Sequence, residues 1–163
     1  MGPSLSIMRS GCVINMTSRG FQDCAFVNGN PSTIAVNESI VISVNSRGFY
    51  LVPFESVLCT VGNLRRFYTS AYSGNSQNET DYLVEYVDGL SNGTLVLSIM
   101  WDDVTSQPMT SAYPFILSRL GVDLNPLQFR GKFAFITQIG NSERAIVDLL
   151  APGGPPADLT VYV

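Results

Sequence analysis

The most apolar stretch of the chain, residues 95–101, reads Leu-Val-Leu-Ser-Ile-Met-Trp and is followed by two aspartates. A helix that spans a membrane needs about 20 apolar residues, so this stretch is too short to cross a bilayer. Its length fits a β-strand, and its nearly continuous apolar character predicts that both faces of the strand are covered. The stretch therefore points to a strand-rich fold without membrane insertion.

Several other segments have the composition and length of β-strands. Residues 39–44 and 48–52 are rich in β-branched and aromatic residues and flank a polar linker with glycine, which predicts a hairpin. Residues 129–139 predict another strand, with its phenylalanines at positions 133 and 135 on one face. Residues 145–150 and 159–163 predict the last two strands.

Two segments have helical periodicity and are followed directly by glycine, which commonly ends a helix. The first is residues 80–88, where Thr80 is the expected N-cap. The second is residues 111–120, where Ser111 is the expected N-cap and Pro114 falls in the first turn. The pattern predicts two or three short helices among a majority of strands.

The chain has 163 residues, enough for one domain with a substantial core. No internal repeat, heptad pattern or linker-like composition divides it. We therefore expect a single mixed α+β domain over residues 1–163.

Charge argues against nucleic acid as a partner. The chain has 13 acidic and 9 basic residues, a net charge of −4 and no polybasic run. Phosphate backbones are bound by surfaces rich in lysine and arginine, so we expect no nucleic-acid binding. The adjacent Arg65 and Arg66 are interpreted as a solvated patch.

Catalysis is also disfavoured. The chain has no histidine, which removes the commonest general base and metal ligand. Asp102 and Asp103 are neighbours whose side chains point in opposite directions on an extended chain, so they do not suit paired-carboxylate chemistry. No glycine-rich phosphate-binding loop is present. We expect no enzymatic activity, no metal site and no cofactor.

The three cysteines are Cys12, Cys24 and Cys59, and an odd number leaves at least one without a partner in the chain. Cys12 and Cys24 close a short loop, and we predict a disulfide between them. Two buried free thiols are the alternative.

Four Asn-x-Ser/Thr sequons begin at Asn15, Asn37, Asn78 and Asn92. Chance predicts about half as many for this composition, so we interpret them as N-glycosylation sites. Glycans would also solubilise a chain in which only 13% of the residues are charged. These features predict a secreted or cell-surface protein.

Trp101 and Asp102, at the end of the most apolar strand, are candidates for ligand binding. A carboxylate accepts hydrogen bonds from sugar hydroxyls, and an aromatic ring stacks on the C–H face of a sugar. The alternative is a core tryptophan followed by an aspartate that solvates a turn. Arg130 is either a donor to a ligand oxygen or an ion-pair partner on a strand.

The order of several segments along the chain is distinctive: residues 46–52, 81–87, 93–99, the aspartates 102–103, and residues 115–121 and 129–136. This order resembles the ILEI/PANDER (GG) domain family, which includes domains of interleukin-like EMT inducer, pancreatic-derived factor and the stem of protein O-mannose N-acetylglucosaminyltransferase. The resemblance is clearest over residues 38–150.

The resemblance implies a non-catalytic β-sandwich, in which two mainly antiparallel sheets pack together and short helices flank them. In the transferase stem, a cleft of this domain binds a glycan sugar through an aspartate and an arginine that match Asp102 and Arg130. We therefore predict a ligand site formed by Asp102, Arg130 and Trp101. The first two can share a ligand only if their strands are antiparallel or their flanking loops reach back.

The predicted function is extracellular recognition of a carbohydrate or glycoprotein. The alternative is a protein–protein interaction module, either a cytokine-like ligand or an adhesion or assembly domain of a larger extracellular protein. Self-association or flanking domains would then supply the partner surface.

Overall fold

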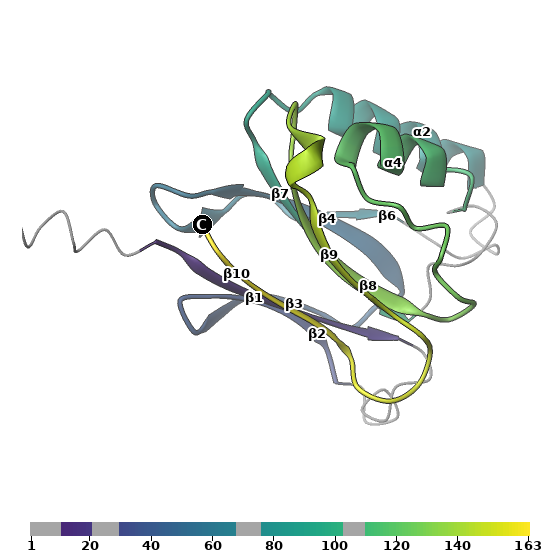
Figure 1. Ribbon diagram of the computed structural model, residues 1–163, viewed down its shortest axis with the longest axis horizontal. Helices are drawn as coiled ribbons and strands as arrows, with labels where there is room; N and C mark the ends of the chain where they lie inside the picture. The colour runs from purple at the N-terminus through teal and green to yellow at the C-terminus, as the bar shows by residue number, and fades with distance from the viewer. Residues whose placement is uncertain (1–10, 21–29, 68–75, 103–109) are drawn as a thin grey trace, which may run out of the picture.

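The computed structural model describes residues 11–20, 30–67, 76–102 and 110–163 (Figure 1). Strands dominate these ranges, as the sequence predicted. The described strands are β1 (Val13–Gly20), β2 (Ser32–Val36), β3 (Ser39–Val44), β4 (Gly48–Glu55), β5 (Thr60–Val61), β6 (Arg65–Phe67), β7 (Leu95–Asp102), β8 (Lys132–Gln138), β9 (Ile146–Leu150) and β10 (Ala157–Tyr162). The helices are α2 (Ser76–Asp88), α4 (Tyr113–Leu120) and the single 3₁₀ turn η3 (Ser142–Arg144).

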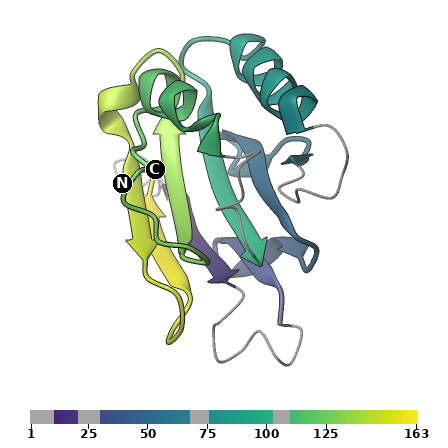
Figure 2. The ribbon, with the colours of Figure 1, turned by 90° about the vertical axis from the view of Figure 1, so that its right-hand side faces the viewer.

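Strand β7 is the centre of one half of the sheet. It pairs antiparallel with β4 along its length and with β8 over Leu95–Ser98, and β9 extends the sheet beyond β8. Strands β5 and β6 both pair with β4. Figure 2 shows β7 and β8 running side by side in opposite directions beneath the two α-helices.

Strand β1 is the centre of the other half, where it pairs antiparallel with β10 and with β2, and β2 pairs with β3. The last two residues of β1, Arg19 and Gly20, then pair in parallel with Trp101 and Asp102 of β7.

This contact joins all ten described strands into one mixed sheet, so the predicted pair of separate, mainly antiparallel sheets is not confirmed. The physical reason is that β1 continues past the first residue of β10 and reaches the edge of β7.

Two apolar clusters cover the two faces of β7, as its sequence predicted. Val96 and Met100 belong to the cluster beneath the helices, together with Phe49 and Phe135. Leu97 and Ile99 belong to a second cluster, which also contains residues of β1, β2 and β10. The half of the sheet around β1 therefore packs against the half around β7, and the helices form a further layer (Figure 1).

Both predicted helices exist, but their starts differ from the prediction. Helix α2 begins at Ser76, so Thr80 lies inside it and does not cap it. Helix α4 begins at Tyr113 after Ala112, and the Ser111 hydroxyl lies 3.1 Å from that of Thr80, which links the two helices. The predicted end is confirmed: Gly121 follows α4 with a φ of 72°, in the left-handed region that favours glycine.

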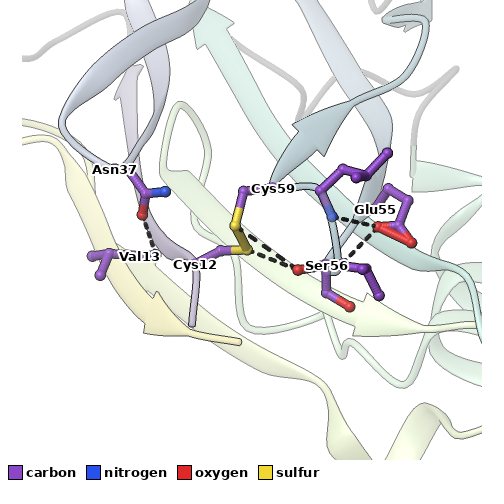
Figure 3. Close-up of a disulfide and its surroundings, with 8 residues drawn as sticks. Cys12, Val13, Asn37, Glu55, Ser56 and Cys59 are labelled. Atoms are coloured by element: carbon purple, nitrogen blue, oxygen red, sulfur yellow. Dashed lines mark hydrogen bonds between the residues drawn. A yellow bond between two sulfur atoms is a disulfide. The ribbon is translucent and has the colours of Figure 1, made fainter. Parts of the chain in front are cut away.

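The disulfide joins Cys12 to Cys59, which corrects the predicted Cys12–Cys24 pair (Figure 3). Cys24 lies outside the described residues. Cys12 directly precedes β1 and Cys59 directly precedes β5, so the fold brings together two residues that are 47 positions apart. The Ser56 carbonyl oxygen lies 3.0 Å from the Cys12 sulfur. Because a disulfide sulfur carries no proton, this is a contact and not a hydrogen bond.

Candidate functional site

Asp102 is the last residue of β7 and has an unusual backbone conformation. Its φ is 76°, in the left-handed region that non-glycine residues rarely adopt, and the residue is only 7% exposed. A conformation of this kind costs on the order of 1–3 kcal/mol and persists only where its surroundings hold it. Such residues are enriched at functional sites, and Asp102 is one of five described here.

The two oxygens of the Asp102 carboxylate have different surroundings. Oδ2 accepts a hydrogen bond of 2.8 Å from Nε of Arg47, and this same contact is an ion pair. Oδ1 is buried and has no hydrogen-bond partner among the described residues. Leaving a buried acceptor unsatisfied costs about 1–3 kcal/mol, so a hydroxyl donor that reached this oxygen would be bound favourably.

Arg47 lies in the turn between β3 and β4 and is held from the other side by a second arginine. Its backbone carbonyl oxygen accepts hydrogen bonds from Nε and Nη2 of Arg66, at 3.1 and 2.6 Å. The side chain of Arg66 passes close to Gly48, where a Cβ would lie 3.1 Å from Arg66 Cγ. Arg66 is therefore part of a partly buried network, which differs from the predicted solvated patch.

Trp101 is partly buried against the cluster between the two halves of the sheet. Its indole Nε1 donates a hydrogen bond of 3.1 Å to the backbone carbonyl of Asn30. The ring therefore helps to pack the fold, and its part in ligand binding remains a prediction.

Arg130 precedes β8 in a turn, whereas the sequence placed it on a strand. Its φ is 62°, so the strand begins later, at Lys132. The guanidinium lies over the ring of Phe129, 5.0 Å from the ring centroid, and that ring is 67% exposed. Arginine over an aromatic face is a common arrangement at ligand and protein interfaces.

The antiparallel pairing of β7 and β8 meets the condition set above for a shared site at Asp102 and Arg130. The two strands separate after the pair Ser98 and Phe135, however, and the end of β1 takes the place beside Asp102. The ion-pair partner of Asp102 is consequently Arg47 and not Arg130.

Sequence reasoning missed Arg47 and Arg66. A signal was present, since the predicted hairpin at residues 39–52 places Arg47 in the linker just before the start of β4. Only the β4–β7 register, which pairs Gly48 with Trp101, aligns that start with the end of β7.

The predicted glycosylation sites have different environments. Asn37 and Asn92 lie in exposed turns. Asn15 lies on β1, where its side-chain nitrogen donates hydrogen bonds to Asp158 and Thr160. Asn78 lies in α2, and its side chain is outside the description. Modification of all four remains a prediction.

The described residues contain no group of three or more histidine, cysteine, aspartate or glutamate side chains placed to hold a metal ion. None of the described helices is long and apolar enough to cross a membrane.

A family model described as interleukin-like EMT inducer (ILEI) matches residues 47–141, from Arg47 of the network to the turn after β8. No curated protein matches the chain. The ILEI family is extracellular, and the Cys12–Cys59 disulfide agrees with this setting. Because the match covers more than half of the 163 residues and includes the end of β7, the chain belongs to the ILEI family.

Proposed function

We propose that this protein is a secreted, non-catalytic recognition module that binds a carbohydrate at the Asp102 end of β7. The observation that carries the proposal is the buried, conformationally strained aspartate, of which one oxygen is fixed by Arg47 and the other has no partner among the described residues. A carboxylate held in this way is oriented before the ligand arrives, and it accepts hydroxyl hydrogen bonds with little loss of side-chain entropy.

The ligand is a glycan presented on a glycoprotein or free in the extracellular space. Arg130, which the resemblance places in the site, would donate to a ring or hydroxyl oxygen from its position over Phe129. Arg47 orients the aspartate and is assigned a positioning role, because its Nε is already engaged with Oδ2.

The test is a glycan-array screen of the purified protein with the variant Asp102→Asn beside it. Asparagine has nearly the same shape and tolerates a positive φ, so the fold should persist while the charged acceptor is lost. We expect binding to fall by about tenfold or more, which is the usual effect of removing a charge-assisted hydrogen bond.

The matched control is Asp88→Asn, which removes a carboxylate from the exposed ion pair with Arg119. This variant should bind glycans as the wild type does. Carbohydrate recognition is contradicted by a blank array, and the assignment of the site is contradicted by equal loss in the two variants.

Protein–protein recognition is a second candidate function, and the turn between β4 and β5 favours it. Val57 and Leu58 in this turn are 84% and 72% exposed. Their backbone N–H groups donate to the Glu55 carboxylate at 2.7 and 3.1 Å, and the disulfide at Cys59 follows directly (Figure 3). A pre-organised turn with adjacent exposed apolar side chains suits insertion into a partner.

For this second candidate we expect self-association that the double variant Val57→Ser/Leu58→Ser weakens by about tenfold, since two exposed apolar anchors are removed. Sedimentation analysis over a range of concentrations measures the effect. The control Ile40→Ser/Val41→Ser changes two exposed apolar residues on β3 and should leave the association constant unchanged. A wild-type protein that stays monomeric at every concentration rules out self-association through this turn.

A further inference from the structure

A groove of about 610 Å³ lies between β8 and the last residues of β10, away from Asp102. Leu95, Ile136 and Val161 provide apolar lining on its inner side. Tyr162, which is 79% exposed, and Arg144 lie at its border. Tyrosine and arginine beside a recessed apolar surface are the residue types that contribute most to protein interfaces.

Two open strand edges flank this groove. Among the described strands, β9 pairs only with β8 and β10 pairs only with β1. The two strands leave the loop 151–156 toward different layers of the fold (Figure 1). Near that loop they are linked by a hydrogen bond of 2.9 Å from the Asp158 N–H to the Asp148 carboxylate. Toward Ile146 and Tyr162, where the groove lies, no hydrogen bond joins their described residues.

An open edge carries backbone N–H and C=O groups that can pair with another extended chain. On β10 the side chains alternate, with Val161 buried and Thr160 and Tyr162 exposed. A strand added here would therefore alternate in the same way, with every second side chain facing the apolar lining.

Among the described residues that line the groove, Arg144 is the one with a charged side chain. No carboxylate of the described residues pairs with Arg144, whose side chain makes only a long contact of 3.4 Å to the Gln138 side-chain oxygen. A peptide carboxylate that reached this guanidinium would gain a charge-assisted interaction without breaking an existing ion pair.

We infer that the groove binds an extended peptide segment of another protein, which adds a strand to the free edge of β10. The segment places an apolar side chain against Leu95, Ile136 and Val161 and an acidic side chain against Arg144. Main-chain hydrogen bonds supply affinity, and the alternate side chains supply specificity, as in other cases of strand addition. This surface is separate from the carbohydrate site and does not depend on it.

The test uses a phage-displayed library of random dodecapeptides, selected on the immobilised full chain. Peptides that combine acidic and β-branched residues should be enriched. Binding of the selected peptides, measured by fluorescence anisotropy, should weaken by about tenfold or more in Arg144→Glu and in Tyr162→Ala, as for residues at the centre of an interface.

The matched controls are Arg65→Glu and Tyr82→Ala, which make the same changes at exposed positions on β6 and α2. These variants should bind the peptides as the wild type does. Amide hydrogen exchange gives a second readout that does not rely on substitution: exchange at Thr160–Tyr162 should slow when a selected peptide is added.

Three results would overturn the inference. The first is a selection that enriches no peptide. The second is peptide binding that neither Arg144→Glu nor Tyr162→Ala weakens, or peptide binding that slows amide hydrogen exchange only at β3. The third is a concentration-dependent dimer that disappears in Arg144→Glu, because a second copy of the chain would then occupy the groove. Unchanged thermal unfolding of both groove variants establishes that a loss of binding is not a loss of fold.

Discussion

Replacing Cys12 and Cys59 together by alanine is expected to lower the free energy of unfolding by about 4 kcal/mol. The disulfide closes a loop with a sequence separation of 47, and a cross-link of that span removes much of the entropy of the unfolded chain. The double replacement avoids leaving a buried free thiol at Cys12. Chemical denaturation of the oxidised wild type and of the variant, followed by circular dichroism, measures the difference.

The control is Cys24→Ala, which should keep the disulfide and nearly all of the stability. Peptide mapping without reduction identifies the partner of Cys12 directly. A peptide that joins Cys12 to Cys24, or a Cys24→Ala variant as unstable as the double variant, would contradict the pairing described above.

Phe49→Ala is expected to cost about 3–5 kcal/mol of stability, as large-to-small changes of buried aromatic residues do. Phe49 is fully buried on β4 beneath the helices. Its ring centroid lies 6.1, 5.7 and 6.3 Å from those of Phe67, Phe133 and Phe135. Alanine would leave a cavity among three rings, which come from β6 and β8 and cannot all move inward.

Phe129→Ala makes the same chemical change at an exposed ring and should alter stability by no more than about 0.5 kcal/mol. Phe49→Leu should fall between the two, because leucine fills part of the space. Thermal and denaturant unfolding of the three variants gives the order. Equal losses in Phe49→Ala and Phe129→Ala would mean that the cluster beneath the helices is not the stabilising core.

The features that the sequence predicted well depend on neighbouring residues. The apolar run at 95–101 predicted a strand covered on both faces, and β7 is such a strand. Pro114 and Gly121 marked the beginning and end of a helix because they restrict or permit backbone angles whatever the fold around them.

The helix starts show the limit of this local reasoning. Ser111 has the chemistry of an N-cap, but its hydroxyl lies within hydrogen-bonding distance of Thr80 on the other helix. A hydroxyl group forms a hydrogen bond with whichever partner the tertiary structure brings near. Neighbouring residues in the sequence therefore do not decide whether Ser111 caps its own helix or contacts the other helix.

The disulfide failed as a prediction for a related reason. Proximity along the chain favoured Cys12 and Cys24, whereas the connection that exists depends on where β1 and the turn before β5 lie in the folded sheet. Sequence separation says little about distance once strands far apart in the chain are neighbours.

The candidate site divides along the same line. Motif order along the sequence, which resembles the ILEI family, singled out Asp102 and Arg130. The residue that pairs with Asp102, however, is Arg47, which is 55 positions away in the chain. The β4–β7 register brings Arg47 next to Asp102. At this end of β7, the last two residues of β1 pair with β7 in the place that β8 occupies further along the strand.

The sequence by itself determined the family, the strand-rich composition and the burial of β7, because these follow from residue order and from local periodicity. Only the tertiary structure decided that the ten described strands form one sheet, that Cys12 pairs with Cys59, and that one oxygen of Asp102 has no hydrogen-bond partner among the described residues. Each of these depends on strand register and on contacts between distant segments, which local preferences do not encode.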